Sequence, residues 1–325
     1  MKKIFLISIL LLISGFILLI AILSTTGYET NKFNNIIYKK VNENNKNISL
    51  NLKTIKFKFD IKNLSLYLVT NEPKLEFKNL DIPIKNIRIY LDLTALIKRE
   101  NKINKIKVLS GELDVNQLKS ILVKTKPSNL NSFINNKVKK GKLITEIEFY
   151  LNNNQKIETF IAKGEVRDIE AKLINNLQVK NTSFNFFADS SDILIKNVKS
   201  NTDGIVIKNG HLQIQKKEKI YIQSDFNSEI KINKKNIENY LTFIKNFEFK
   251  KEELNLIANI DHFLDISFDN TLKVTNYEYT NKGNISQLSL NFNKPFKNFL
   301  SKKDVNDFTF KDISLNFKYN SEKKK

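Results

Sequence analysis

The chain has 325 residues, with 54 Lys and Arg against 34 Asp and Glu, so its formal net charge is +20. It has no Cys and two His, His211 and His262, which excludes disulfides, thiolate metal sites and cysteine nucleophiles and disfavours a His-based catalytic relay. All but three of the basic residues are Lys, and they are spread along the whole chain, whereas nucleic-acid recognition favours Arg and a concentrated basic patch. We therefore predict no nucleic-acid partner.

An uncharged apolar run extends from Ile4 to Leu23, about the 20 residues that span a bilayer core. A cleaved signal peptide is the alternative, but its apolar core is shorter, and the segment from Ala21 to Ser24 is a poor cleavage site. The run therefore predicts an uncleaved membrane anchor, which we place at residues 1–27. Lys residues lie on both sides of the run, so charge alone leaves its orientation open.

Beyond residue 48 the dominant period is two. Apolar and polar residues alternate, for example, at 55–61, 87–93, 254–260 and 313–319. Such alternation is typical of strands with one apolar and one polar face, and it predicts a mainly β, largely antiparallel fold. The apolar face of such a sheet can be hidden in a sandwich, in a closed barrel, under helices and loops, or in a curved groove that holds a ligand; the period alone leaves these open.

The clearest turn signal is Asn209-Gly210, which lies between the apolar segments 205–207 and 212–214 and predicts a two-residue hairpin. With the segment 220–222, this hairpin predicts a three-stranded antiparallel meander. Further turns are predicted from clusters of Asn at residues 152–154, 175–176 and 281–284.

A short pattern, apolar-Lys-Asn/Asp-apolar, recurs along the chain. Its two adjacent polar residues shift the alternation by one position, as a bulge or bend in a long strand does. Chance is the alternative, because Lys, Asn and Ile are abundant. The pattern occupies residues 61–64, 77–80, 84–87, 195–198 and 310–313.

Helical patterns are few. Short ones lie at 94–99, 116–123 and 128–138, and a longer one with helical spacing of Ile237, Tyr240, Leu241 and Ile244 lies at 234–247. The predicted organisation lists four parts in chain order: an anchor at 1–27, an N-terminal β region at 28–125, a helical linker at 126–140, and a repeated β-sheet region at 141–325 with a helix near 234–247.

No motif for enzymatic chemistry is present: there is no Gly-rich phosphate loop, no nucleophile elbow, no His-Glu-x-x-His and no Ca²⁺ loop. We interpret His211 as a surface residue of the predicted Asn209-Gly210 turn and His262 as a structural histidine. We therefore predict no catalytic residues, no cofactor, no metal site and no enzymatic activity.

The first half of the chain resembles the AsmA-like family of bacterial envelope proteins, which includes TamB and YhdP. The resemblance begins in the anchor, continues through Tyr38-Lys39-Lys40-Val41 and the strands to Leu68, and is strongest from Leu75 to Val115, where strand, bend, strand, short Leu-rich helix and strand follow one another. The segment from Ala162 to Ser200 is similar to the repeated sheet segments of the YhdP branch.

The resemblance implies a single-pass protein of the bacterial inner membrane with its bulk in the periplasm. It implies a long, curved, groove-like β-sheet through which phospholipid acyl chains pass towards the outer membrane, in outer-membrane homeostasis and biogenesis. Other envelope proteins would complete the bridge between the inner and outer membranes. The alternative is a structural or assembly factor of the cell envelope that binds a protein partner through its sheet edges. The candidate groove-lining residues, each with plain core packing as the alternative, are Phe184, Phe186, Ile193, Ile195, Ile205, Ile207, Leu212 and Ile214.

Overall fold

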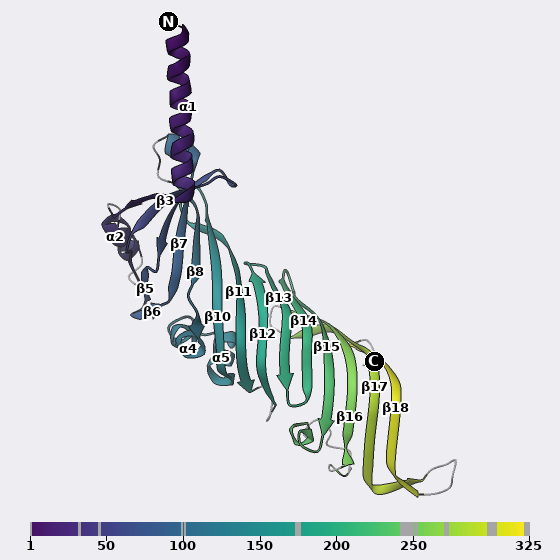
Figure 1. The fold of residues 1–325 in the computed structure, drawn as a ribbon. Coiled ribbons are helices and arrows are strands. Elements are labelled where there is room, and N and C mark those ends of the chain that lie inside the picture. The colour runs from purple at the N-terminus through teal and green to yellow at the C-terminus, as the bar shows by residue number, and fades with distance from the viewer. Residues whose placement is uncertain are drawn as a thin grey trace. The chain divides into compact units, whose positions relative to one another are not determined.

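In the computed structural model of the chain, the described residues are 2–31, 34–44, 47–98, 100, 102–172, 177–240, 250, 253–269, 273–297 and 304–321. They form one large antiparallel sheet, a small second sheet and few helices, which confirms the mainly β fold class (Figure 1). The chain divides into two compact units. The first comprises Met1–Leu113, Ser120–Thr125 and Ile144–Ala162, and the second comprises Asp114–Lys119, Lys126–Leu143 and Lys163–Lys325.

The N-terminal apolar run forms helix α1 (Lys2–Thr25). Within it, the 23 residues Lys3–Thr25 are long and apolar enough to cross a membrane, since they span about 35 Å at 1.5 Å per residue. The remaining helices are α2 (Asn34–Asn44), α3 (Leu93–Ile97), α4 (Val115–Val123), α5 (Asn129–Lys137) and the 3₁₀ helix η1 (Ile237–Asn239).

In the first unit, which includes β10 from Ile144 onward, the strands of the large sheet follow the order β1-β3-β4-β7-β8-β10, and β2, β5 and β6 form the small sheet. The bounds of these strands and of β9, which pairs with β10, are β1 (Tyr28–Thr30), β2 (Ile48–Asn51), β3 (Ile55–Asp60), β4 (Ser65–Asn71), β5 (Lys74–Phe77), β6 (Leu80–Ile82), β7 (Ile84–Leu91), β8 (Ile103–Ser110), β9 (Leu113–Asp114) and β10 (Val138–Leu151).

The alternating apolar residues of the first unit form one face of the sheet. Cross-strand partners point to the same side, and the register pairs Phe57 with Leu68, Leu68 with Ile89, and Ile89 with Ile106. The small sheet and α2 cover part of this face, and Ile55 is only 2% exposed there. The hydrophobic core of this unit therefore lies between two sheets.

In the second unit, which includes β11 from Lys163 onward, successive strands from β11 to β18 are neighbours in the sheet, and the ribbons of β12 to β16 lie side by side (Figure 1). Among the described strands, the path through the large sheet ends at β1 and β18, so the sheet is not closed. The bounds are β11 (Ile157–Lys172), β12 (Gln178–Ala188), β13 (Asp192–Thr202), β14 (Ile205–Lys216), β15 (Ile220–Asn233), β16 (Asn255–Phe268), β17 (Val274–Lys297) and β18 (Asp304–Asn320).

The predicted hairpin at Asn209-Gly210 is wrong. Both residues lie inside β14, which pairs along its length with β15, and Gly210 does not have a positive φ. A Cβ at Gly210 would lie 3.1 Å from the Cβ of Phe226, so glycine here permits a close approach between strands. The actual two-residue loop is Asp203-Gly204, both with positive φ, between the paired residues Thr202 and Ile205.

His211 and the predicted meander differ from expectation for the same reason. His211 is a strand residue of β14 paired with Asp225, because the turn that was expected to expose it does not form. The segment 204–223 therefore contributes to two long strands and not to three short ones. The turn at 152–154 is confirmed, 281–284 lies inside β17 instead, and 175–176 lies outside the described residues.

The recurrent apolar-Lys-Asn/Asp-apolar pattern marks backbone irregularities. Asn197 in β13 and Asp312 in β18 have φ of 57° and 55°, and the β7–β8 register shifts between Ile84 and Asn86. The occurrences at 61–64 and 77–80 form the hairpin turns after β3 and β5 instead. Asn and Asp tolerate the left-handed region better than other residues with a side chain, which explains why they occupy these places.

The short helices lie close to their predicted positions, as α3, α4 and α5. The longer helix expected near 234–247 is different in its described part, since turn residues and η1 occupy 234–240. Residues 241–249 lie outside the described residues.

Candidate functional site

The candidate groove-lining residues of β12, β13 and β14 share one face of the second unit. Phe186 pairs with Ile195, and Ile195 pairs with Leu212. Ile193 pairs with Ile214 in the same register. Phe184 lies two residues from Phe186 and therefore on the same side. Cross-strand pairing thus brings these side chains into adjacent rows.

The same face continues onto β15 and β16. Ile205 pairs with Ile230, and Ile207 pairs with Ser228. Ile214 pairs with Ile222, which pairs in turn with Ile266. We call this side of β12 to β18 the apolar face, and it includes all the predicted lining residues.

One end of the apolar face is an ordinary core. Ile237 of η1 is 2% exposed and packs in a cluster with Ile230 and Ala258, against which Ile205 also packs. The Tyr240 hydroxyl donates a hydrogen bond of 2.7 Å to the Thr202 carbonyl, and burial raises the Tyr240 pKa to about 12. Core packing is therefore the observed role of Ile205.

The other predicted residues belong to neither of the buried core clusters of the described chain. Ile193 is 39% exposed, and Phe184, Phe186, Ile195, Leu212 and Ile214 are half-buried. The cover formed by η1 packs against the other end of the face, so we call these rows its uncovered part. The structure thus separates the predicted residues into a covered end and an uncovered remainder.

Sequence reasoning missed the aromatic residues at the β17–β18 end of this face. Phe317 pairs with Asn281 on the apolar face, and Phe310 and Phe317 are 45% and 48% exposed. Phe292 and Phe308 pack edge to face with ring centroids 5.7 Å apart. The alternation at 313–319 was the signal that could have identified Phe317.

A second apolar surface lies in the first unit, beside α1. A concavity of about 690 Å³ is bounded by one side of α1 and by residues of β1, β3 and β4. The Lys58 ammonium donates a hydrogen bond of 2.9 Å to the Thr25 carbonyl, where a cation is favourable at the C-terminus of a helix. The residues that line it are Gly15, Leu18, Leu19, Ile22, Leu23, Tyr28, Phe57 and Leu66.

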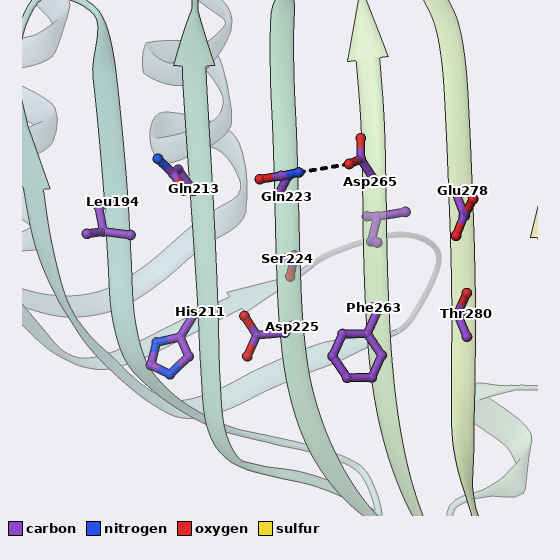
Figure 2. A pocket seen from close by; sticks show the side chains of 11 residues that line it. Leu194, His211, Gln213, Gln223, Ser224, Asp225, Phe263, Asp265, Glu278 and Thr280 are labelled. Atoms are coloured by element: carbon purple, nitrogen blue, oxygen red, sulfur yellow. Dashed lines mark hydrogen bonds between the residues drawn. The ribbon is translucent and has the colours of Figure 1, made fainter.

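The opposite face of the second unit carries a polar concavity of about 320 Å³ (Figure 2). His211, Asp225, Asp265 and Glu278 point into it from four different strands. The Gln223 amide donates to Asp265 at 2.9 Å, and Glu278 forms a 2.8 Å ion pair with Lys318. Because polar and charged side chains from four strands line it, this concavity does not suit an acyl chain.

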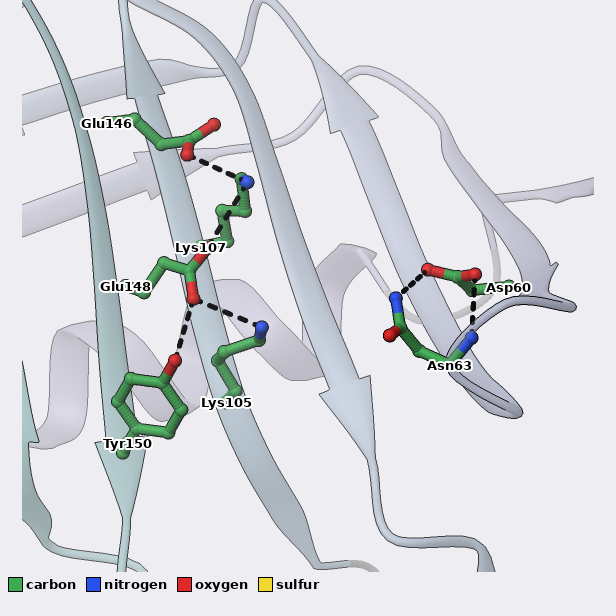
Figure 3. A network of polar contacts seen from close by, with 7 residues as sticks. All are labelled: Asp60, Asn63, Lys105, Lys107, Glu146, Glu148 and Tyr150. Atoms are coloured by element: carbon green, nitrogen blue, oxygen red, sulfur yellow. Dashed lines mark hydrogen bonds and ion pairs between the residues drawn. The ribbon is translucent and has the colours of Figure 1, made fainter. Parts of the chain in front are cut away.

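The polar face of the first unit contains a half-buried ion-pair network (Figure 3). Glu148 lies 3.1 Å from Lys105 and 3.2 Å from Lys107, and accepts a 2.9 Å hydrogen bond from Tyr150. Burial alone would raise the Glu148 pKa, but the hydrogen bonds from Tyr150, Lys105 and Lys107 outweigh it and lower the pKa to about 2. A carboxylate held ionised in this way ties β8 to β10.

Among the described residues, no group of three or more His, Asp and Glu side chains is placed to hold a metal ion. No family model, curated protein or solved structure matches the chain. The apolar face and the surface beside α1 are therefore the features of the described structure that bear on function.

Proposed function

We propose that the chain is a membrane-anchored protein that carries phospholipid acyl chains along the apolar face. In this proposal it is held in the bacterial inner membrane by α1, with its bulk in the periplasm. It passes lipid towards the outer membrane, as the AsmA-like resemblance implies. The observation that carries the proposal is the uncovered part of the apolar face, in which Phe186, Ile195 and Leu212 form a cross-strand row apart from the core cluster around η1.

The mechanism we propose is passive. Moving an acyl chain through water costs about 0.8 kcal/mol per exposed methylene group, and an apolar wall removes that cost without chemical conversion of the lipid. The sheet would curve around the acyl chains to form a groove. Neighbouring cross-strand rows of the apolar face offer similar apolar contacts, so an acyl chain can move from one row to the next without a large energy barrier.

The concavity beside α1 supports a route from the bilayer. Its helix-side residues, from Gly15 to Leu23, belong to the part of the chain that is apolar enough to lie in the membrane. Its sheet-side residues, Phe57 and Leu66, belong to the strands of the first unit. A lipid acyl chain that leaves the bilayer at this concavity would remain in apolar surroundings.

The test is the phospholipid that co-purifies with the full chain, measured by mass spectrometry, together with transfer of labelled phospholipid between vesicles. Leu212→Asp places a charge on the uncovered apolar face and should reduce both quantities several-fold. Gln213→Asp places the same charge on the opposite face of the same strand and is the matched control. A lipid-free wild-type chain without transfer activity would contradict the proposal.

The second candidate function is an assembly factor that pairs with a partner protein through a sheet edge. It is favoured by β18, a strand of 17 residues at the end of the strand path with exposed Phe310 and Phe317. Cross-linking from an exposed position in β18, such as Lys318, would capture a stable protein partner in that case. A captured partner together with an absence of bound lipid would favour this function over lipid transport.

A further inference from the structure

A polar cluster interrupts the apolar face of the second unit. His262 contacts Ser228 on one neighbouring strand through Nε2, at 2.8 Å, and Tyr279 on the other through Nδ1, at 2.6 Å. Phe226, its cross-strand partner, stacks on the imidazole with ring centroids 4.4 Å apart. The predicted structural role of His262 therefore includes two hydrogen bonds that the sequence did not indicate.

The surrounding groups fit a neutral imidazole, which needs one acceptor and one donor. The Ser228 hydroxyl lies 3.4 Å from the Ile260 carbonyl, and the Asn281 amide donates to the Tyr279 hydroxyl at 3.5 Å. We assign Nε2–H as the donor to the Ser228 hydroxyl, which in turn donates a hydrogen bond to the Ile260 carbonyl, and the Tyr279 hydroxyl as the donor to Nδ1. A proton added at Nδ1 would force Tyr279 to stop donating.

The cluster lies where the covered and uncovered parts of the apolar face meet. On one side, Ser228 is 1% exposed and Ile260 belongs to the core. On the other side, Leu264 and Ile222 are half-buried and lie outside that core cluster. An acyl chain that occupies the uncovered rows up to this boundary would contact the ring of His262.

The electrostatic surroundings of the ring are simple. Burial lowers the His262 pKa, and the charge of Asp261, which lies next to it in sequence and points to the opposite face, acts in the other direction. Of the side chains in contact with the ring, Tyr279 is titratable, and Ser228 and Phe226 are not. A positive ring here would have no acidic hydrogen-bond partner on the apolar face.

We propose that the Ser228–His262–Tyr279 cluster makes acyl-chain binding depend on pH. The neutral ring stacks on Phe226 and leaves room for a lipid acyl chain to pack beside it. The imidazolium formed in acid requires water that the acyl chain would displace, so acid releases the acyl chain. This inference rests on the proposed function, because it concerns the same apolar face.

The test uses the full chain in detergent micelles and a pyrene-labelled phosphatidylcholine, whose headgroup does not change charge between pH 5 and 7.5. Binding to the wild-type chain should weaken by about 3- to 10-fold from pH 7.5 to pH 5, the range that proton linkage allows for a histidine titrating below its ordinary value. His262→Phe and His262→Gln should both bind equally at the two pH values. His211→Gln, on the opposite face, should keep the pH dependence.

A second measurement does not depend on how the His262 variants fold. The chain has two histidines, so ¹³C-histidine labelling gives two ring signals, and His211→Gln assigns them. Saturation with the probe should lower the midpoint of the His262 titration and leave that of His211 unchanged. An unchanged His262 midpoint would overturn the inference.

The outcomes separate the two proposals. pH-independent binding by the wild-type chain, or unchanged pH dependence in both His262 variants, overturns the inference while lipid binding stands. If the wild-type chain binds no probe at either pH, the proposed function fails and the inference falls with it.

Discussion

The two units use the same alternation of apolar and polar residues and differ in what covers the apolar side. In the first unit, α2 and the small sheet of β2, β5 and β6 pack over it, and Ile55 is buried. In the second unit, the described cover is confined to one end, near Ile237, and Ile193 remains exposed. An alternating strand therefore predicts an apolar face without predicting whether that face becomes a core or a binding surface.

The same substitution, Ile to Ala, should give the largest difference in stability between the two units. Ile55→Ala should lower the free energy of unfolding by about 2–5 kcal/mol, because it removes buried methyl groups and leaves a cavity. Ile193→Ala should cost less than about 1 kcal/mol, because that side chain is partly in water already. Urea unfolding of the full chain in micelles, followed by circular dichroism, measures both. Equal losses would show that the face around Ile193 is also a closed core.

The ion-pair network of the first unit should give the next largest effect. The Glu148 pKa is about 2 in the folded chain, below its ordinary value of 4.5, so the folded state binds this proton less tightly than the unfolded state. The stabilisation, about 1–3 kcal/mol, is present above pH 4.5 and is lost as the pH falls towards 2. Glu148→Gln should remove this part of the acid dependence in urea titrations between pH 2 and 6. An unchanged profile would contradict the network's role.

The cover at one end of the second unit can be tested through the hydroxyl group of Tyr240. Tyr240→Phe removes the hydrogen bond to Thr202 and leaves its carbonyl without that donor, at a cost of about 1 kcal/mol. An ultraviolet titration should also show one tyrosine that ionises only near pH 12, and this signal should disappear in the variant. If all tyrosines ionise near pH 10, the cover is open in solution.

The smallest effect is expected from the exposed ion pair of Lys53 and Glu72 in the first unit. Their side chains are 67% and 75% exposed, so water and salt screen the interaction. Lys53→Ala should change the free energy of unfolding by less than about 0.5 kcal/mol. A loss comparable to that of Glu148→Gln would show that exposure does not separate the two kinds of ion pair.

Several features were predictable because they are local. The apolar run before Leu23 predicted a helix long enough for a membrane, and the alternation predicted which residues share a face. The Lys-Asn/Asp pattern predicted backbone irregularities because Asn and Asp tolerate positive φ. Asn209-Gly210 was misread because its turn preference is weak compared with continuous pairing of β14 along β15, whereas Asp203-Gly204 carried the same signal at the real loop.

Local sequence was enough for the apolar N-terminal helix and for the alternation that gives most strands an apolar and a polar face, since both depend on neighbours within a few residues. The extent of the cover over the apolar face could not be predicted in this way, because it depends on contacts between distant segments, such as Tyr240 with Thr202. The tertiary structure also placed Ser228, His262 and Tyr279 together from three strands. Strand pairing, and not spacing along the chain, sets those distances.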